Sequence, residues 1–421
     1  MTTFAPVQPV NYARTLGPLE HVFSLVDQHR SVHFAMAAHI EGQATDSEWY
    51  AALDALQRRH PLFSVSIAAG QDGAPRFCTA VNARIPLRIV ANPAHEQWQE
   101  EMAKELATPF DVGQAPLVRA VLLRGIDESI LILTAHHSIA DGLSISYAIR
   151  DLLRALCGEK LEPTTLMPAQ ESLVESWLEE AGGARVPQQT EPAQAGRPVT
   201  FRRLDGTLPK IDAVRFTHEL TARLTNRARE EHTTVHGALC AALVLAGREL
   251  SKDWRNAPVR VLSPFNLRKQ IGVGEKCGIF VWAGIVPVEP AKHAEFWDLA
   301  RSIKVSLTAG QTANCVALGM EGLAQALDGG VDVHGASQIL ANAFPCELLL
   351  TNLGNRTSHF NCGELKLRAL WGPAVFMGFQ GEQTVGVTTT NGSLCMLHTS
   401  FTPIPSLTAR AARLLCSFCA I

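Results

Sequence analysis

Apolar and polar residues in the first 160 positions of the chain follow two different periods. Stretches in which apolar residues run together or alternate with polar ones predict strands, and an apolar residue every three or four positions predicts a helix. The predicted strands cover residues 31–42, 62–69, 116–124 and 129–135. The predicted helices cover residues 45–61, 94–106 and 143–158. Thr45 and Glu48 have the spacing of a capping box, and Gly158 is placed to end the third helix.

The second part of the chain mixes helices and strands again. Residues 179–200 are rich in Gly, Pro, Gln and Ala and have almost no large apolar side chains, which is typical of a linker. Beyond them we predict helices at 219–232, 234–250 and 293–307 and strands at 258–263, 278–289 and 347–354. Residues 384–401 predict a hairpin, because Asn391-Gly392 is a favoured two-residue turn. Both parts therefore have an α/β (α+β) character.

The last segment, residues 406–421, has the apolar spacing of an amphipathic helix. Four of its apolar residues fall on one side: Leu407, Leu414, Leu415 and Phe418. The same segment holds Cys416 and Cys419, the one close pair among ten cysteines. A metal or redox site would need a second pair or a strand-to-helix setting, so we expect these two cysteines to pack in the core.

Composition narrows the class of protein. Hydrophobic residues make up 47% of the 421 positions and charged residues 18%, so the chain can bury a large core. The formal net charge of −3 gives no basic excess, and we expect no binding to nucleic acid. The opening residues do not resemble a secretory signal, and the most apolar run, 238–247, is too short to span a bilayer. We therefore expect a cytoplasmic protein with no membrane span and with reduced cysteines.

The segment LTAHHSIADGLS, residues 133–144, is the strongest candidate for chemistry. It leads from a predicted buried strand into a predicted helix, and loops at strand ends commonly carry function. A neutral imidazole of His136 or His137 can take a proton from a hydroxyl or amine near pH 7. Asp141 can fold back to fix the loop, and Gly142 allows either an unusual backbone angle or the close approach of a ligand.

Three interpretations of this loop stay open on the residues alone. The two histidines could be satisfied loop residues with no role in chemistry. They could bind a metal with Asp141 as a third ligand, although no His/Glu pair in helical register accompanies them. They could also supply a general base. An activated serine is not expected, because the chain has no Gly-x-Ser-x-Gly, and the Gly-rich residues 272–278 lack the context of a phosphate loop.

HHSIADG, residues 136–142, matches the HHxxxDG signature of the condensation-domain and chloramphenicol-acetyltransferase-like superfamily, and the chain resembles that family over nearly its full length. The resemblance extends to free-standing polyketide-associated and alcohol acyltransferases. Further segments that resemble family segments are LGPLEHVF (16–23), HIEGQ (39–43), RRHPLF (58–63), TTVHGALCAAL (233–243), SPFNLRKQ (263–270) and LLLTNLG (348–354).

The resemblance implies a fold of two chloramphenicol-acetyltransferase-like halves arranged as a V, with an active-site tunnel between them. The halves would be residues 1–178 and 201–421, joined by the linker 179–200. The resemblance also implies roles for four residues: His137 as the general base, His136 packed inward, and Asp141 paired with Arg268 as a structural ion pair. Asn266 stands where the family pattern before this arginine has Asp.

Function is expected to follow from the same resemblance. An acyl group would move from a thioester donor, acyl-CoA or a phosphopantetheine-bound acyl chain, to an alcohol or amine in a ternary complex, in natural-product or lipid biosynthesis. The Gly142 N–H would hold the oxyanion. Asn352, Trp371 and Trp282 are candidate substrate contacts.

We expect a monomer with no permanently bound cofactor and no metal, working with a small-molecule acceptor and with an acyl or peptidyl carrier protein as a possible partner. Two alternatives are a non-catalytic module that docks a carrier protein and a free-standing enzyme that forms peptide bonds.

Overall fold

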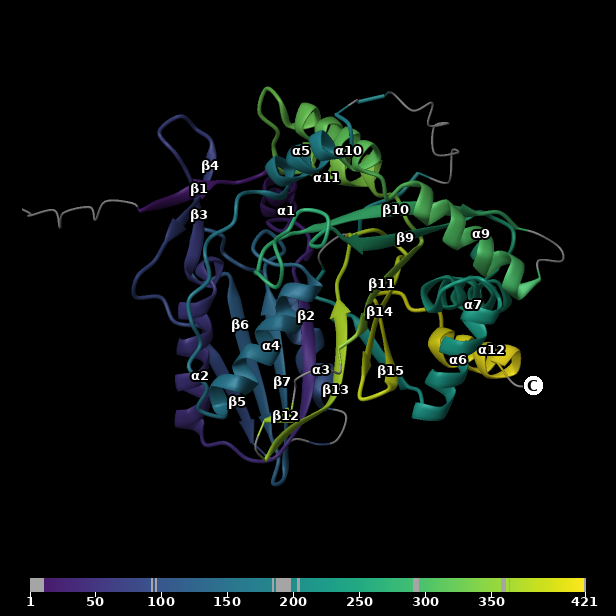
Figure 1. Ribbon diagram of the computed structural model, residues 1–421, viewed down its shortest axis with the longest axis horizontal. Coiled ribbons are helices and arrows are strands. Elements are labelled where there is room, and N and C mark those ends of the chain that lie inside the picture. Colours follow the sequence, from purple (N-terminus) through teal and green to yellow (C-terminus); the bar gives the residue numbers. More distant parts are fainter. Residues whose placement is uncertain are drawn as a thin grey trace, which may run out of the picture.

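The computed structural model describes residues 11–419 apart from 92–93, 95–96, 184, 187–197, 203–204, 291–294, 357–360 and 363. Its elements form two α/β halves that lie side by side (Figure 1). Each half is built on a six-stranded sheet, and a small three-stranded sheet joins the first half. The described part of the chain therefore has the mixed α/β architecture that the sequence predicts.

The first large sheet has the order β12-β13-β2-β7-β6-β5. Its strands are β2 (Phe34–Glu41), β5 (Leu87–Ala91), β6 (Val118–Arg124), β7 (Glu128–Ala135), β12 (Asn361–Cys362) and β13 (Leu365–Ala374). Alternate residues of β2 face opposite sides, as the period of a strand requires. One face packs against α2 (Asp46–Arg59) and α4 (Gly142–Leu156), and the other packs against α3 (Gln97–Ala107).

The second large sheet has the order β10-β9-β11-β14-β15-β8. Its strands are β8 (Lys210–Arg215), β9 (Val259–Asn266), β10 (Val281–Val288), β11 (Leu348–Asn355), β14 (Gln383–Thr390) and β15 (Ser393–Ser400). The helices of this half are α6 (His218–Glu230), α7 (Val235–Leu250), α8 (Lys252–Arg255), α9 (Phe296–Ala309) and α12 (Leu407–Cys419). The apolar helix α7 packs between the sheet and the helices α9 and α12, which explains why its residues are apolar on nearly every side.

The small sheet and four helices complete the fold. The sheet has the order β1-β4-β3, with β1 (Tyr12–Thr15), β3 (Val65–Ala69) and β4 (Pro75–Thr79). The helices α1 (Pro18–Val26), α5 (Gln170–Glu180), α10 (Ala313–Leu327) and α11 (Val333–Ala343) gather at one end of the molecule (Figure 1). Because α1 belongs to the first half and α10 and α11 to the second, one apolar core crosses between the halves.

Most of the predicted elements are confirmed. Thr45 caps α2 in a capping box with Glu48, and Asn391-Gly392 forms the turn between β14 and β15. The expected strand at 62–69 starts later, because a 3-10 turn occupies Pro61–Ser64. The apolar pattern does not predict α10, α11 or β13. Through β12 and β13 the second half supplies two strands to the first sheet, so the sheets do not divide simply at the linker.

The predicted linker and the last helix differ in how far the structure describes them. Within 179–200, residues 184 and 187–197 lie outside the described residues, so the linker stays a prediction. In α12 the buried positions include Leu407 and Leu415, but Phe418 is 36% exposed and stacks on Phe296. Cys419 is buried, whereas Cys416 is exposed, so the expectation that both cysteines pack in the core is wrong for Cys416.

No helix among the described residues is both long enough and apolar enough to cross a bilayer.

Candidate active site

The histidine loop, residues 136–141, joins the end of β7 to the start of α4. Because β7 lies in the middle of the first sheet, the loop emerges inside the molecule rather than at its edge. It is held from both halves: Ser138 Oγ donates to Glu20 O (2.8 Å), and Asp141 N–H donates to Gly278 O (3.1 Å). All of its residues are buried except His137, which is partly exposed. The loop therefore presents one imidazole to the space between the halves.

The His137 ring packs between aromatic side chains. It stacks parallel to Phe23, with ring centroids 4.3 Å apart, and lies tilted against Phe34 at 4.8 Å. Burial lowers the pKa of His137 below its usual value, although nearby backbone carbonyls and the Asp141 charge act in the opposite direction. The imidazole is therefore neutral at neutral pH, which is the protonation state that a general base needs.

His136 points away from this space, into the first half. Its Nδ1 accepts a hydrogen bond from Ser138 N–H (3.1 Å), so its ring proton lies on Nε2, 3.5 Å from Asp27 Oδ2. Burial lowers the pKa of His136 to about 4, against the opposing charge of Asp27. The other Asp27 oxygen, Oδ1, accepts from the backbone N–H groups of Val32 and His33 and lies 2.8 Å from His33 Nδ1. His136 thus stabilises the loop on the side away from the space between the halves.

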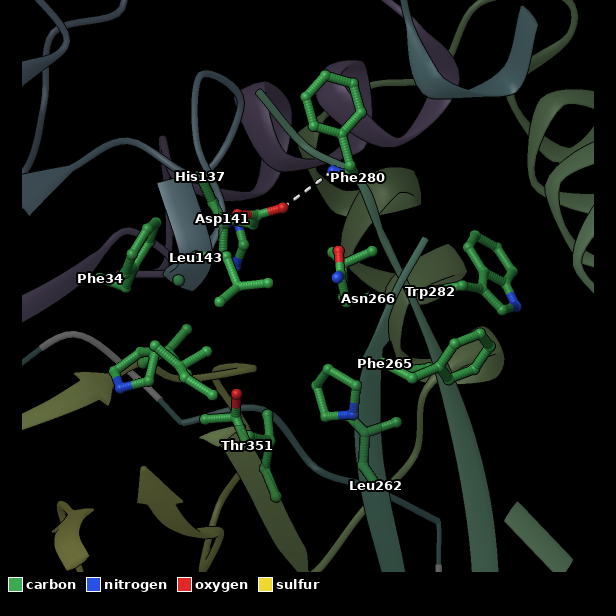
Figure 2. A pocket seen from close by; sticks show the side chains of 18 of the residues that line it. Phe34, His137, Asp141, Leu143, Leu262, Phe265, Asn266, Phe280, Trp282 and Thr351 are labelled. Carbon is green, nitrogen blue, oxygen red and sulfur yellow. Dashed lines mark hydrogen bonds between the residues drawn. The ribbon is translucent and has the colours of Figure 1, made fainter. Parts of the chain in front are cut away.

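Asp141 and Arg268 form a buried ion pair between the two halves. Arg268 donates from Nη1 to Asp141 Oδ2 (2.7 Å) and from Nη2 to Oδ1 (2.9 Å). The same carboxylate accepts the Ser144 N–H at the start of α4 and the Phe280 N–H, the second of which is drawn in Figure 2. Burial alone raises the pKa of Asp141, but Arg268 and these N–H donors hold it below its usual value. Asn266 Oδ1 accepts from the Arg268 backbone N–H (3.1 Å), so this amide supports the arginine.

Gly142 begins α4 next to the ion pair, and space rather than backbone angle explains the glycine. Its φ is not in the left-handed region. A Cβ at this position would lie 2.6 Å from Pro373 Cγ and 3.1 Å from Leu353 Cδ2. N–H groups in the first turn of a helix have no acceptor within the helix and carry its positive end. The Gly142 N–H therefore has the properties of an oxyanion donor.

His137, Asp141, Gly142 and Arg268 all line one cavity of about 230 Å³ between the two sheets. His137, Asp141 and Leu143 come from the first half, and Leu262, Phe265 and Trp282 face them from the second (Figure 2). The walls are mostly apolar and aromatic. The further lining residues are Leu19, Phe23, Phe34, Gly142, Pro264, Asn266, Arg268, Phe280, Val281, Ala283, Phe344, Leu349, Thr351, Asn352, Leu353, Arg356, Pro373, Val375, Phe376 and Met377.

The structure separates the candidate substrate contacts. Trp282 and Asn352 line the cavity, although Asn352 also uses its Oδ1 to accept the Gly354 N–H (2.8 Å). Trp371 is not among the residues that line this cavity, so the geometry gives no support to the expectation that it contacts substrate. Its ring is buried against Trp98 at 5.7 Å, on the α3 side of the first sheet, because its position on β13 faces that side.

The metal interpretation of the loop finds no support in this geometry. His136 faces Asp27, Asp141 faces Arg268 and His137 faces the cavity, so the three side chains do not converge on one point. Within the described ranges no three His, Cys, Asp or Glu side chains form a metal-binding group. Sequence reasoning missed Asp27 and Phe34, which pack around the histidines. No local pattern marks them, because long-range pairing and packing bring them to the loop.

Comparison with known proteins places this geometry in a family. The family model described as the condensation domain matches residues 21–319. Tyrocidine synthase 3 of Brevibacillus parabrevis is 27% identical over 289 residues, which cover 65% of this chain and 4% of that protein. Surfactin synthase subunit 1 of Bacillus subtilis is 28% identical over 228 residues, 50% of this chain and 6% of that protein. The chain thus spans a small fraction of these curated relatives.

Solved structures agree in fold over nearly the full length of the chain. The first condensation domain of the CDA synthetase has a TM-score of 0.71 at 14% identity, covering 97% of this chain and 96% of that one. Polyketide synthase associated protein 5 from Mycobacterium tuberculosis has a TM-score of 0.65 at 17% identity, covering 98% and 99%. These likenesses show a shared fold, and the match to the family model over residues 21–319 shows that the chain belongs to the condensation-domain family.

Proposed function

We propose that this chain is an acyltransferase that moves an acyl group from a thioester to an amine or alcohol. Condensation domains form amide or ester bonds with carrier-bound substrates, which supports a transferase of this broad kind. The observation that carries the proposal is the His137 imidazole, held neutral by burial at the wall of a cavity to which both halves contribute. The donor would be acyl-CoA or an acyl chain on the phosphopantetheine of a carrier protein.

The reaction would proceed by direct transfer. The acceptor attacks the thioester carbonyl through a hydroxyl or a neutral amine, and His137 takes the proton that this group loses. The Gly142 N–H, at the positive end of α4, stabilises the oxyanion. When the tetrahedral intermediate collapses, the carbon–sulfur bond breaks and the proton on His137 passes to the leaving thiolate.

Asp141 has no proton-transfer role in this proposal. Its carboxylate stays ionised beside Arg268 and holds the histidine loop of the first half against the second half. A covalent acyl-enzyme is not part of the scheme either, because no cysteine among the described residues lines the cavity. Donor and acceptor must therefore occupy the cavity at the same time.

The test is a thiol-release assay with octanoyl-CoA and octanoyl-N-acetylcysteamine, run with and without a set of small amines and alcohols. We expect free thiol to appear together with an amide or ester of the acceptor, which mass spectrometry identifies. Incubation with donor alone should leave the mass of the protein unchanged. A stable mass gain equal to the acyl group would contradict direct transfer. No acceptor-dependent release from any donor, carrier-bound octanoate included, would favour the alternative of a non-catalytic docking module.

A further inference from the structure

Arg356 is the unbalanced charge of the cavity. Among the lining residues that the structure describes, three carry a formal charge at neutral pH, and two of them, Asp141 and Arg268, neutralise each other. Arg356 forms no ion pair with any carboxylate in the described part of the chain. Its Nε donates to the backbone oxygen of Asn355 (2.9 Å), which leaves the Nη1 and Nη2 donors available. An otherwise apolar cavity thus contains a net positive charge.

A bulge in β11 aims this side chain. Leu349, Thr351 and Leu353 line the cavity, whereas Leu348 and Leu350 pack on the other face of the sheet; Asn352, next to the bulge, also borders the cavity. Ordinary alternation would place position 356 on the other face. The register with β14 shifts between Asn352 and Asn355, however, so the strand contains one extra residue there. An extra residue reverses the alternation and turns Arg356 to the face of Leu353.

The bulge is built into the local sequence. Gly354 adopts a φ of 69°, which favours glycine, and its N–H donates to Asn352 Oδ1 at 2.8 Å. Arg356 N–H then returns to the ladder by donating to Thr389 O at 2.7 Å. Asn352, expected from the sequence to touch substrate, therefore also fixes the backbone that presents the arginine. Bulges of this kind commonly re-aim a side chain next to an active site.

We propose that Arg356 binds a carboxylate or phosphate group carried by one of the two substrates. Two parallel N–H donors of a guanidinium match two oxygens of such an anion, and the interaction is strong where water is largely excluded. The apolar walls would hold the remainder of that substrate. That the anion belongs to a substrate rests on the proposed acyl transfer, whereas the binding of an anion by Arg356 does not depend on that function. The anion could belong to the acceptor as a carboxylate or to the donor as the phosphate of its pantetheine arm.

The first experiment measures anion binding without turnover. Octanoate, octyl phosphate and the neutral octanamide are titrated by calorimetry into the wild type, Arg356→Gln, Arg356→Lys and the control Arg84→Gln, which changes an exposed arginine. We expect the two anions to bind the wild type and the control about tenfold or more tighter than they bind Arg356→Gln. Arg356→Lys should lie between them, because lysine keeps the charge and loses the paired donors. Equal octanamide binding by all four proteins shows that the cavity is intact.

Two outcomes of this experiment would overturn the inference. One is that the wild type binds octanoate and octyl phosphate no more tightly than octanamide. The other is that Arg356→Gln binds both anions as tightly as the wild type does.

A second pair of comparisons identifies the source of the anion. If Arg356→Gln weakens the binding of octanoyl-CoA but not that of octanoyl-N-acetylcysteamine, Arg356 binds the phosphate of the donor. If the variant weakens the binding of leucine but not that of leucinamide, Arg356 binds the acceptor's carboxylate. If the substitution changes the binding of neither pair, the assignment of the anion to a substrate is overturned. Thiol release that does not depend on Arg356 would refute this inference alone, whereas Arg356-dependent anion binding without any thiol release would refute the proposed function alone.

Discussion

Replacing Asp141 with Ala should destabilise the fold rather than remove a reacting group. The substitution deletes the acceptor of five hydrogen bonds, two from Arg268, two from Ser144 and one from Phe280. The Arg268 side chain is only 4% exposed, so its charge would stay buried without a partner. Breaking a buried ion pair in this way costs about 3–5 kcal/mol, and losing the cap of α4 adds about 1 kcal/mol. The sum is a large part of the roughly 5–15 kcal/mol that stabilises a typical domain.

The assay is urea unfolding followed by tryptophan fluorescence, with the soluble yield measured alongside. Asp72→Ala is the matched control, because it breaks the exposed pair of Asp72 and Arg76 and should leave the unfolding midpoint close to that of the wild type. The double variant Asp141→Ala/Arg268→Met should recover part of the loss, because it removes the stranded cation. A soluble Asp141→Ala protein with an unchanged unfolding midpoint would refute the structural role. If that protein were also inactive, the carboxylate would belong to the chemistry.

Two further predictions concern the cavity wall and the base. Gly142→Ala places a methyl group 2.6 Å from Pro373 Cγ, so we expect a stability loss of about 1–3 kcal/mol and a lower kcat/KM. An unchanged unfolding midpoint would contradict the close packing. Because burial lowers the pKa of His137, kcat/KM should persist below the imidazole's usual pKa of about 6.5, with its acid limb at lower pH. An acid limb centred above pH 7 would show that the titrating base is not this buried imidazole.

The sequence predicts the parts of the fold that have a local signal. Thr45 and Glu48 cap α2 because a capping box is a matter of spacing within one turn, and Asn391-Gly392 makes a tight turn because both residues tolerate a positive φ. The histidine loop is found the same way, since a motif lies in consecutive residues. The Asp141–Arg268 pair spans 127 positions, and only the resemblance to a family indicated it.

Other features have no local signal. Trp371 looks like a cavity residue until the pairing of β13 with β2 decides which face of the first sheet it occupies. The direction of Arg356 depends on one extra residue in β11 opposite β14, and that register exists only in the assembled sheet. Phe23 reaches His137 because α1 packs over the loop. Such contacts arise from tertiary packing, which the periodicity of a single segment does not specify.

The most direct test of the central claim compares thiol release by His137→Ala with that of the wild type, using octanoyl-CoA and an acceptor that the wild type accepts. The exposed His334, changed to Ala, serves as the matched control. A positioned general base contributes about 10²–10⁴-fold, so His137→Ala should lose that factor in kcat while its unfolding midpoint stays near that of the wild type. The control should keep its rate. Near-normal turnover by a folded His137→Ala protein, with unchanged KM values, would contradict the assignment of His137 as the base.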